Sequence, residues 1–286
     1  MLSILIPTYN YDCSRLINDL WLQCTTSGID FEILVCDDGS TQEYSKSLSA
    51  INLPNYTFEA LTNNIGRAKI RNRLAHKAQG EWLLFIDCDA EINDSQFINN
   101  YKKNLQDNTV LVGGTAYYPH CDTPNHSLRW TYGTEREGNS NYKKNFTTFN
   151  FAIQRHIFLN IQFDETLTQY GHEDTIFQLM LERNNITIKF IDNPLVHCGL
   201  DDNKIYLEKI KTSNNNLLAL YQSGKYPELQ QHSKLLNTYL KLKQKHFTLL
   251  FNLFYKIIKP LIIKNLTSTK PKIKLLDIYK LGELCA

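Results

Sequence analysis

A continuous apolar run from Trp82 to Ile86 follows Gly80 and Glu81 and ends at two aspartates, Asp87 and Asp89. Such a run is typical of a strand buried on both faces of a parallel sheet. In extended geometry the two carboxylates, two residues apart, point to the same side. Ligands of open α/β sheets bind beyond the carboxyl ends of the strands, so we expect these carboxylates to face a ligand.

Two neighbouring carboxylates repel each other unless a cation lies between them. Their oxygen atoms suit Mg²⁺ or Mn²⁺, and such a cation in turn suits a diphosphate. An isolated Asp-x-Asp is more often a solvated turn, so the site depends on the preceding strand and on other polar strand ends. With that support, the pattern predicts a metal-assisted nucleotide site.

Further strands alternate with helices in the first part of the chain. Apolar runs at Leu2–Ile6, Phe31–Cys36 and, more weakly, Tyr56–Leu61 predict strands, and we expect Pro7 to stop the first of them. This alternation predicts an α/β fold with a mixed, mostly parallel sheet flanked by helices. The strand ends carry three polar pairs that together indicate a nucleotide pocket: Tyr9-Asn10, Asp37-Asp38 and Asp87-Asp89.

The motifs at these strand ends resemble those of the family 2 glycosyltransferases. They cover about the first 115 residues and comprise Ile6-Pro7-Thr8-Tyr9-Asn10, Val35-Cys36-Asp37-Asp38-Gly39-Ser40, Asn64-Ile65-Gly66 with Arg71-Asn72, and Phe85-Ile86-Asp87-Cys88-Asp89. The resemblance implies the GT-A (Rossmann-like) fold, a nucleotide-sugar donor, a divalent metal (Mn²⁺ or Mg²⁺) and inverting transfer. It also favours a bacterial enzyme of polysaccharide biosynthesis, with UDP as the donor nucleotide.

The resemblance assigns roles on the donor side. Pro7 and Tyr9 would pack against the base and ribose, and Asp38 or its neighbour Asp37 would accept a hydrogen bond from the base. Cys88 departs from the family pattern, and its side chain should point away from the pocket. The implied donor-binding residues are Pro7, Thr8, Tyr9, Asp37, Asp38, Asn64, Gly66, Arg71, Asp87 and Cys88.

The remaining donor-side roles concern the diphosphate, the sugar and the metal. By the same resemblance, Asn64, Gly66 and Arg71 would line the nucleotide and diphosphate. Asp87 would touch the ribose or the sugar, and Asp89 would hold the metal.

An acidic motif, Tyr170-Gly171-His172-Glu173-Asp174, precedes an apolar helical run. Acids in a first helical turn also cap free N–H groups, so a purely structural role fits this pattern. The segment resembles the family's acceptor-side motif, which points to Asp174 rather than Glu173 as general base. An inverting transfer needs such a base to take the proton of the acceptor hydroxyl, a contribution of roughly 10²–10⁴ in rate.

Three features of the middle of the chain remain open. His197 follows a strand predicted at 186–191; such a histidine is usually structural, but the family often places a second metal ligand here. Gly113-Gly114, in a strand predicted at 110–115, would let the backbone approach a sugar or would form a plain bulge. The polar stretch 118–145 predicts a long loop, which we interpret as a flap over the site.

The net charge of +2 hides an asymmetry. Residues 225–286 contain 12 lysines, no arginine and three acidic residues, so they carry +9 and residues 1–224 carry −7. Seven cysteines without a Cys-x-x-Cys pair fit reduced thiols. The amino terminus does not match a signal peptide, and no run has the length of a transmembrane helix. We therefore expect a cytoplasmic protein, with no nucleic-acid partner.

The basic tail defines the expected domains: a GT-A domain at 1–224, with a donor half at 1–115 and an acceptor half at 116–224, and a helical extension at 225–286. Within the extension, apolar residues recur at helical spacing from Phe247 to Ile262, and Pro260 should kink or end the helix. Thr248, Asn252, Lys256 and Lys259 lie on its other face. The helix either packs on the body or a second subunit, or residues 241–280 lie on an anionic membrane at its inner face.

The sequence thus predicts a hexosyl- or N-acetylhexosaminyltransferase that moves a sugar from a UDP-sugar to a hydroxyl of a glycan or lipid-linked acceptor. One alternative is a nucleotidyltransferase, which usually opens with a Gly-rich phosphate loop rather than Pro7-Thr8-Tyr9-Asn10. The other is a non-catalytic nucleotide-sugar-binding protein, which the retained Asp89 and Glu173-Asp174 argue against.

Overall fold

The computed structural model describes residues 1–138 and 146–286. It divides into two compact units that interleave along the chain. Unit 1 comprises Met1–Ala116, Lys143–Thr168 and Met180–Gly199; unit 2 comprises Tyr117–Tyr142, Gln169–Leu179 and Leu200–Ala286. Helix α7, Glu173–Arg183, begins in unit 2 and ends in unit 1. The predicted domains, a GT-A domain at 1–224 with a donor half and an acceptor half and a helical extension at 225–286, stay a prediction.

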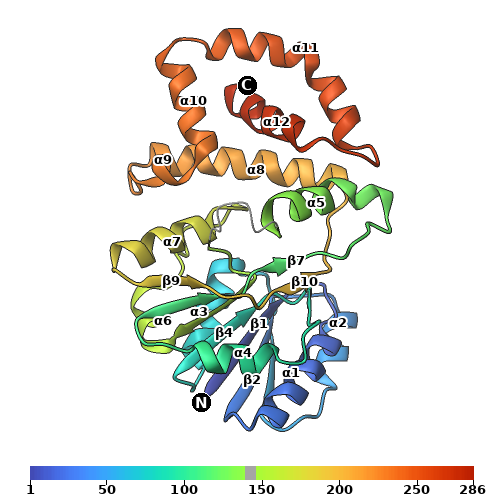
Figure 1. Cartoon of the computed structure of the whole chain (residues 1–286), viewed down its shortest axis with the longest axis vertical. Helices are drawn as coiled ribbons and strands as arrows, with labels where there is room; N and C mark the ends of the chain where they lie inside the picture. The colour runs from blue at the N-terminus through green and yellow to red at the C-terminus, as the bar shows by residue number, and fades with distance from the viewer. Residues whose placement is uncertain (139–145) are drawn as a thin grey trace. The chain divides into compact units, whose positions relative to one another are not determined.

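A seven-stranded sheet forms the centre of unit 1 (Figure 1). The strands β3-β2-β1-β4 are mutually parallel, β8 is antiparallel to both β4 and β6, and β6 is parallel to β9. This confirms the predicted mixed, mostly parallel sheet. In sheet order, the strands are β3 (Tyr56–Ala60), β2 (Phe31–Asp37), β1 (Leu2–Thr8), β4 (Trp82–Ile86), β8 (Asn150–Gln154), β6 (Thr109–Val112) and β9 (Thr187–Phe190).

Amphipathic helices flank this sheet. In α1, the side chains of Leu16, Ile17, Leu20 and Cys24 recur at helical spacing and are buried in the core of unit 1. The helix ends at Gly28, whose φ of 62° is the left-handed conformation that glycine adopts most easily. The helices of unit 1 are α1 (Ser14–Ser27), α2 (Gln42–Ser49), α3 (Arg67–Lys77), α4 (Phe97–Asn104) and α6 (Arg155–Ile161).

A second, three-stranded sheet joins distant parts of unit 1. Its central strand β10, Leu195–His197, pairs with β5, Ala90–Glu91, and with β7, Thr115–Ala116. The antiparallel register sets His197 opposite Ala90. The histidine predicted as a metal ligand is thereby fixed beside the chain that leaves β4.

The first strand does not stop at Pro7, as we had predicted, but runs to Thr8. The Thr8 carbonyl accepts a hydrogen bond from the Asp38 N–H on the β2 side, so the preceding Pro7 faces the opposite side. On that side the pairing with β4 ends at Leu5. Among the described residues, the strand pairing on that side does not reach position 7, so the strand tolerates proline there.

Gly113 makes room for a buried polar network. A Cβ at this position would lie 2.4 Å from Asn150 Nδ2, 2.6 Å from the Asn193 carbonyl oxygen and 2.7 Å from the Tyr101 hydroxyl. Asn150 accepts a hydrogen bond from Tyr101 (2.6 Å) and donates one to the Asn193 carbonyl (2.9 Å). The backbone at Gly113 thus packs closely against side chains of its own unit. This packing explains why the position is a glycine, and no contact with a sugar is needed to explain it.

Unit 2 is helical. Its core contains Leu128, Tyr206, Tyr255, Leu276 and the apolar residues around them. Helix α12 packs against α5, α8, α10 and α11. Figure 1 shows these C-terminal helices together. The helices are η1 (Pro124–His126), α5 (Ser127–Tyr132), the π-helix η2 (Gly133–Glu137), α8 (Asn203–Gln222), α9 (Leu229–His232), α10 (Lys234–Gln244), α11 (Thr248–Leu266) and α12 (Ile273–Cys285).

Two expectations for this unit are corrected. The predicted loop at 118–145 is wrong for Pro124–Glu137, which is helical, whereas 139–145 lies outside the described residues. Pro260 does not end its helix, since it lies inside α11. Across the described residues, the length and apolarity that a membrane crossing needs occur in no single helix, only in α10 and α11 combined, which are bent by 119°.

Candidate active site

The carboxyl end of β2 is tied to the loop that precedes α3. Asp38 is buried, and its two carboxylate oxygens accept hydrogen bonds from the N–H groups of Ile65 (2.7 Å) and Gly66 (3.0 Å). Burial raises the pKa of Asp38, and the two N–H donors oppose that rise. The predicted donor residue Asp38 therefore holds the predicted donor residue Gly66 in place.

Gly39 permits the close packing of these two loops. Its φ is 79°, and a Cβ there would lie 2.8 Å from the Asn63 carbonyl carbon and 2.9 Å from the Asn64 nitrogen. A larger residue would therefore be strained and would also push the loops apart. The predicted residues Asp38, Asn64 and Gly66 come together because of this glycine.

Asp37 links the end of β2 to the chain that follows it. One carboxylate oxygen accepts from both the N–H (3.0 Å) and the hydroxyl of Ser40, and the other accepts from the Ser45 hydroxyl (2.8 Å). Asn10 joins the same network, because its N–H donates to Ser40 Oγ (2.7 Å) and its side chain accepts from the Thr41 N–H (3.0 Å). Both aspartates thus hold nearby backbone in place through hydrogen bonds. Their contact with the nucleotide base stays a prediction.

The end of β1 carries the predicted base-stacking residues. Pro7 and Thr8 belong to the strand, and the Thr8 hydroxyl donates to the Tyr11 carbonyl (3.1 Å). Tyr9 follows immediately, with 51% of its surface exposed. Its ring is therefore accessible for stacking, as the proposed role requires.

Helix α3 presents one arginine inward. Arg71 is buried; it pairs with the Asp87 carboxylate and donates to the Arg67 carbonyl (3.2 Å). Its guanidinium carbon lies 5.9 Å from the centre of the Phe163 ring. Burial raises the pKa of Asp87, while the Arg71 charge acts in the opposite direction.

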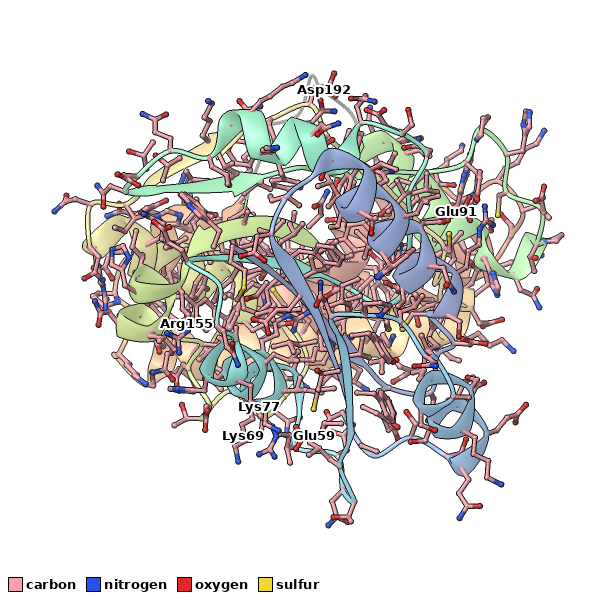
Figure 2. The ribbon with its side chains drawn as sticks, turned by 90° about the horizontal axis from the view of Figure 1, so that it is seen from below. Glu59, Lys69, Lys77, Glu91, Arg155 and Asp192 are labelled. Atoms are coloured by element: carbon pink, nitrogen blue, oxygen red, sulfur yellow. The ribbon has the colours of Figure 1, made fainter. Side chains whose placement is uncertain are left out.

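The outer face of α3 is different in character. There Glu59 accepts from Arg73 (2.9 and 2.6 Å) and pairs with Lys77 (2.7 Å), and the Arg73 bonds above all lower the pKa of Glu59 to about 2. Figure 2 labels Glu59, Lys69 and Lys77 in this region. A pocket of about 380 Å³ lies beside this face, and its lining includes Lys69 and His76. Neither Asp87 nor Asp89 lines this pocket.

The chain turns directly after β4. The Ala90 N–H donates to the Asp87 carbonyl (3.2 Å), so Asp87 and Asp89 do not sit in the extended geometry that we had assumed. Each carboxylate instead has its own partner, Arg71 for Asp87 and His197 for Asp89. Between them, Cys88 packs against the apolar core of unit 1.

Asp89 and His197 form a close pair. The imidazole Nε2 lies 3.1 Å from Asp89 Oδ2. The Phe149 ring packs edge-on against the imidazole, with 5.2 Å between the two ring centres. Burial by itself raises the pKa of Asp89, but His197 and then Arg67 bring it below its usual range. Gly199 gives the carboxylate its space, since a Cβ there would lie 2.2 Å from Asp89 Oδ2.

The Asp89–His197 pair suits a divalent cation. A carboxylate oxygen and an imidazole nitrogen that face one another are a donor set for Mn²⁺, and the oxygen also suits Mg²⁺. The space that Gly199 leaves beside Asp89 Oδ2 lets this carboxylate stay opposite the imidazole. Within residues 1–138 and 146–286, no cluster of three or more His, Cys, Asp or Glu side chains could hold a metal. A cation here would therefore have two protein ligands and would need others from a ligand or water.

The predicted acceptor-side acids open helix α7 in unit 2. Glu173 is buried, and Asp174 accepts hydrogen bonds from the N–H (2.6 Å) and hydroxyl (3.3 Å) of Thr175. Burial and the neighbouring Glu173 charge raise the pKa of Asp174 to about 6. A carboxylate that titrates near the working pH is well suited to take and release a proton.

Helix α8 holds the turn before these acids, which the sequence had not indicated. Gly171 and His172 both have positive φ, 93° and 72°. The Gly171 carbonyl accepts from Asn216 (2.7 Å), and His172 Nε2 lies 3.0 Å from the Ser213 carbonyl. The polar run Ser213-Asn214-Asn215-Asn216 in an otherwise amphipathic helix was the available signal.

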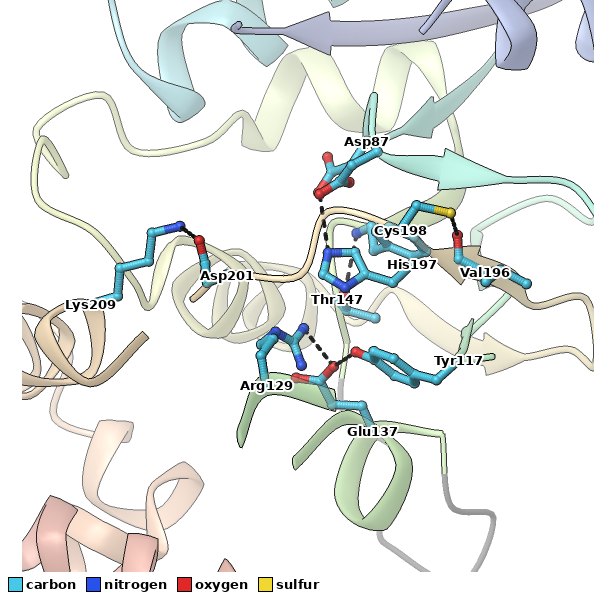
Figure 3. Close-up of polar contacts among 12 residues, drawn as sticks. Asp87, Tyr117, Arg129, Glu137, Thr147, Val196, His197, Cys198, Asp201 and Lys209 are labelled. Carbon is cyan, nitrogen blue, oxygen red and sulfur yellow. Dashed lines mark hydrogen bonds and ion pairs between the residues drawn. The ribbon is translucent and has the colours of Figure 1, made fainter. Parts of the chain in front are cut away.

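A second unforeseen cluster lies in the stretch we had taken for a loop. The Tyr117 hydroxyl donates to the Glu137 carboxylate, and Arg129 donates to the same carboxylate at 2.9 Å (Figure 3). Burial alone would lower the pKa of Arg129, but Glu137 raises it well above its usual value. This cluster stabilises the helical form of the segment.

Comparison with known proteins gives one family. The family model described as Glycosyl transferase family 2 matches residues 3–167. An uncharacterized glycosyltransferase of Haemophilus influenzae is 23% identical over 272 residues, which are 93% of this chain and 92% of the relative. Poly(ribitol-phosphate) beta-N-acetylglucosaminyltransferase TarS of Staphylococcus aureus is 36% identical over 116 residues, 38% of this chain but only 18% of TarS.

Solved structures of glycosyltransferases share the fold. TarS residues 1–349 in complex with UDP-GlcNAc superpose with a TM-score of 0.54 at 18% identity, covering 99% of this chain and 90% of that one. A mannosyltransferase from Pyrobaculum calidifontis, in complex with GDP-Man and Mn²⁺, gives a TM-score of 0.58 at 15% identity, covering 80% and 66%. These likenesses confirm the predicted GT-A type of fold.

Proposed function

Because the chain belongs to the family 2 glycosyltransferases, we propose that it transfers a sugar from a UDP-sugar to a hydroxyl of a glycan or lipid-linked acceptor. The observation that carries the proposal is the pairing of Asp89 with His197, 3.1 Å apart, where the chain leaves β4. The similarity to TarS, named as a beta-N-acetylglucosaminyltransferase, supports a hexose or N-acetylhexosamine as the transferred sugar.

The donor side would combine the exposed Tyr9 with two groups, Asp38 and Arg71, that bonds within the protein already hold in place. Tyr9 would stack on the base or ribose, and Asp38 would keep the Asn64–Gly66 loop beside the nucleotide. Arg71 would act on the diphosphate and at the same time keep Asp87 oriented through their ion pair. Such pre-organisation lowers the entropy lost when the donor binds.

Asp89 and His197 would hold Mn²⁺ or Mg²⁺. When bound, the cation would offset the negative charge that develops on the leaving diphosphate. The protein's own part is to keep the carboxylate and the imidazole facing each other, through the β5–β10 pairing and the space left by Gly199.

Asp174 would act as the general base. The acceptor oxygen attacks the anomeric carbon as the bond from that carbon to the diphosphate oxygen breaks, which inverts the configuration. The proton of the acceptor hydroxyl passes to the Asp174 carboxylate. The raised pKa of Asp174, about 6, supports this role because the group is ionised yet still basic near neutral pH.

The direct test is to incubate the full-length protein with a panel of nucleotide sugars and Mn²⁺ and to measure thermal stability and nucleotide release. A donor at about 100 times its dissociation constant should raise the free energy of unfolding by roughly 2.7 kcal/mol. Release of UDP that requires an acceptor hydroxyl would support transfer. Pyrophosphate production from a sugar phosphate and a nucleoside triphosphate would instead indicate a nucleotidyltransferase, and binding without turnover a non-catalytic protein.

A further inference from the structure

The outward side of helix α11 is apolar. Ile257 is 77% exposed, and Leu249 and Leu261 are each 70% exposed. Isolated exposed apolar residues are ordinary, but a continuous row along one helix usually marks an interaction site. We call this row the α11 apolar face; all its members are at least half exposed, and they are Phe247, Leu249, Leu250, Leu253, Phe254, Ile257 and Leu261.

The opposite side of α11 fixes this orientation. Tyr255, Ile262 and Leu266 are buried in the core of unit 2. The Tyr255 hydroxyl donates to Glu283 of α12 (2.5 Å), and Gly282 leaves room for the Tyr255 ring, since a Cβ there would come within 2.3 Å of it. The helix cannot rotate its apolar face inward without breaking this packing.

The structure thereby divides the apolar stripe predicted from the sequence. Phe251, Ile258 and Ile262 point toward the core, while the α11 apolar face points away from it. On the side expected to be polar and exposed, Lys259 forms an ion pair with Glu283 at 2.6 Å instead.

The charged residues that flank the α11 apolar face in the sequence are of one sign. From Leu229 to Leu276 the sequence contains ten lysines and no acidic residue. Lys241, Lys243 and Lys245 are exposed at the end of α10 and in the turn that leads to α11, and Lys256 and Lys264 are exposed on α11 itself. A partner must therefore accept apolar side chains and supply negative charge.

We propose that the α11 apolar face docks on an anionic lipid bilayer, with the helix lying in the plane of the interface. Apolar side chains would enter the boundary between headgroups and acyl chains. The exposed lysines would interact with anionic headgroups. This docking is independent of the sugar chemistry, and it would hold the protein at the surface where lipid-linked acceptors reside.

A second copy of the chain fits this face less well. A two-fold interface would bring the same lysine-rich segments together, and like charges repel. The nearest acidic residues in the sequence are already paired, Asp277 with Arg136 (2.9 Å) and Glu283 with Lys259 (2.6 Å). The charge pattern therefore favours a lipid surface over self-association.

The test is flotation of the full-length protein with vesicles of phosphatidylcholine alone and of phosphatidylcholine mixed with phosphatidylglycerol. Wild type should float with the mixed vesicles at low salt and lose binding as salt rises, because screening weakens the lysine contacts. Leu250→Ser, Phe254→Ser and Ile257→Ser combined should reduce the binding constant at least about 100-fold. Lys256→Gln with Lys264→Gln should reduce it roughly 30-fold.

Control variants make the same types of substitution elsewhere. Leu22→Ser with Ile205→Ser replaces apolar residues that are 57% and 55% exposed, and Lys103→Gln removes an exposed lysine of α4. These controls should float like wild type, and all variants should retain the wild-type melting temperature. Failure of wild type to float, or equal binding to neutral vesicles, would overturn the proposal. So would a dimer in sedimentation that the triple variant dissociates.

Discussion

The imidazole Nε2 of His197 lies 3.1 Å from Oδ2 of Asp89, although 108 residues separate them in the sequence. The small sheet produces this contact, because β10 pairs with β5 directly after the turn that follows β4. Any metal held at Asp89 would thus depend on a strand from a distant part of the chain.

Replacing the carboxylate tests the metal proposal. Asp89→Asn should abolish the Mn²⁺-dependent part of UDP binding, because the amide carries no negative charge, while the melting temperature changes little. Calorimetry with and without Mn²⁺ measures this. Asp192→Asn, the same change at an exposed aspartate, is the matched control. Unchanged Mn²⁺-dependent UDP affinity in Asp89→Asn would remove the residue from the metal site.

Gly199→Ala tests the space behind Asp89. The added Cβ would lie 2.2 Å from Asp89 Oδ2, so the carboxylate must move away from its position opposite His197. We expect the Mn²⁺ concentration for half-maximal UDP binding to rise about 10–100-fold, as for other groups that orient a metal ligand. A wild-type Mn²⁺ titration in a folded variant would show that the carboxylate position is not critical.

Removing the proposed base should separate binding from catalysis. Asp174→Asn should keep the donor affinity of wild type and lose transfer by roughly 10²–10⁴-fold. Single-turnover transfer and donor titration measure the two quantities. Asp122→Asn, at an exposed aspartate of unit 2, should change neither. Near-normal turnover in Asp174→Asn would transfer the role to Glu173 or exclude both.

The pH dependence follows from the raised pKa of Asp174. A base must be ionised, so kcat should level off above pH 6 and fall about tenfold per unit below it. Glu173→Gln removes the neighbouring negative charge, which lowers the pKa of Asp174 and moves the acidic limb to lower pH. A limb that stays in place in Glu173→Gln would contradict this coupling.

The raised pKa of Asp174 also predicts how the stability of the protein depends on pH. A carboxyl whose pKa is raised on folding stabilises the fold in its protonated form, and this contribution is lost as pH rises through about 6. Asp174→Asn should therefore gain melting temperature relative to wild type at pH 8 and much less at pH 4. Equal differences at both pH values would show that the carboxyl does not titrate in this way.

The strand ends that carry the predicted donor residues could be located from the sequence because their signals are local. Apolar runs such as Trp82–Ile86 form strands that end at polar residues, and their parallel pairing places those ends at one edge of the sheet. The contacts that organise the site were not predictable, because they join distant segments. Nothing near Asp38 in the sequence indicates that its carboxylate binds the Ile65 and Gly66 amides.

The orientation of helix α11 was also not predictable from the sequence. The spacing of apolar residues in α11 predicts a helix, but it does not tell which apolar residues meet the core. The contacts of Tyr255 with α12 determine this orientation. Its ring packs against Gly282, and its hydroxyl donates a hydrogen bond to Glu283, 28 positions later in the sequence. The turn after β4 was missed for a similar reason, since the continuous apolar run Trp82–Ile86 does not show whether the residues after it stay extended.

The strand order of unit 1 has a consequence during protein synthesis. The parallel half of the sheet, β3-β2-β1-β4, is complete once Ile86 has been made, whereas β8, which covers the free edge of β4, begins only at Asn150. Until then a nascent chain presents an unpaired, fully apolar edge strand, Trp82–Ile86, of the kind that seeds aggregation. Fragments that end before Asn150 should therefore depend strongly on chaperones.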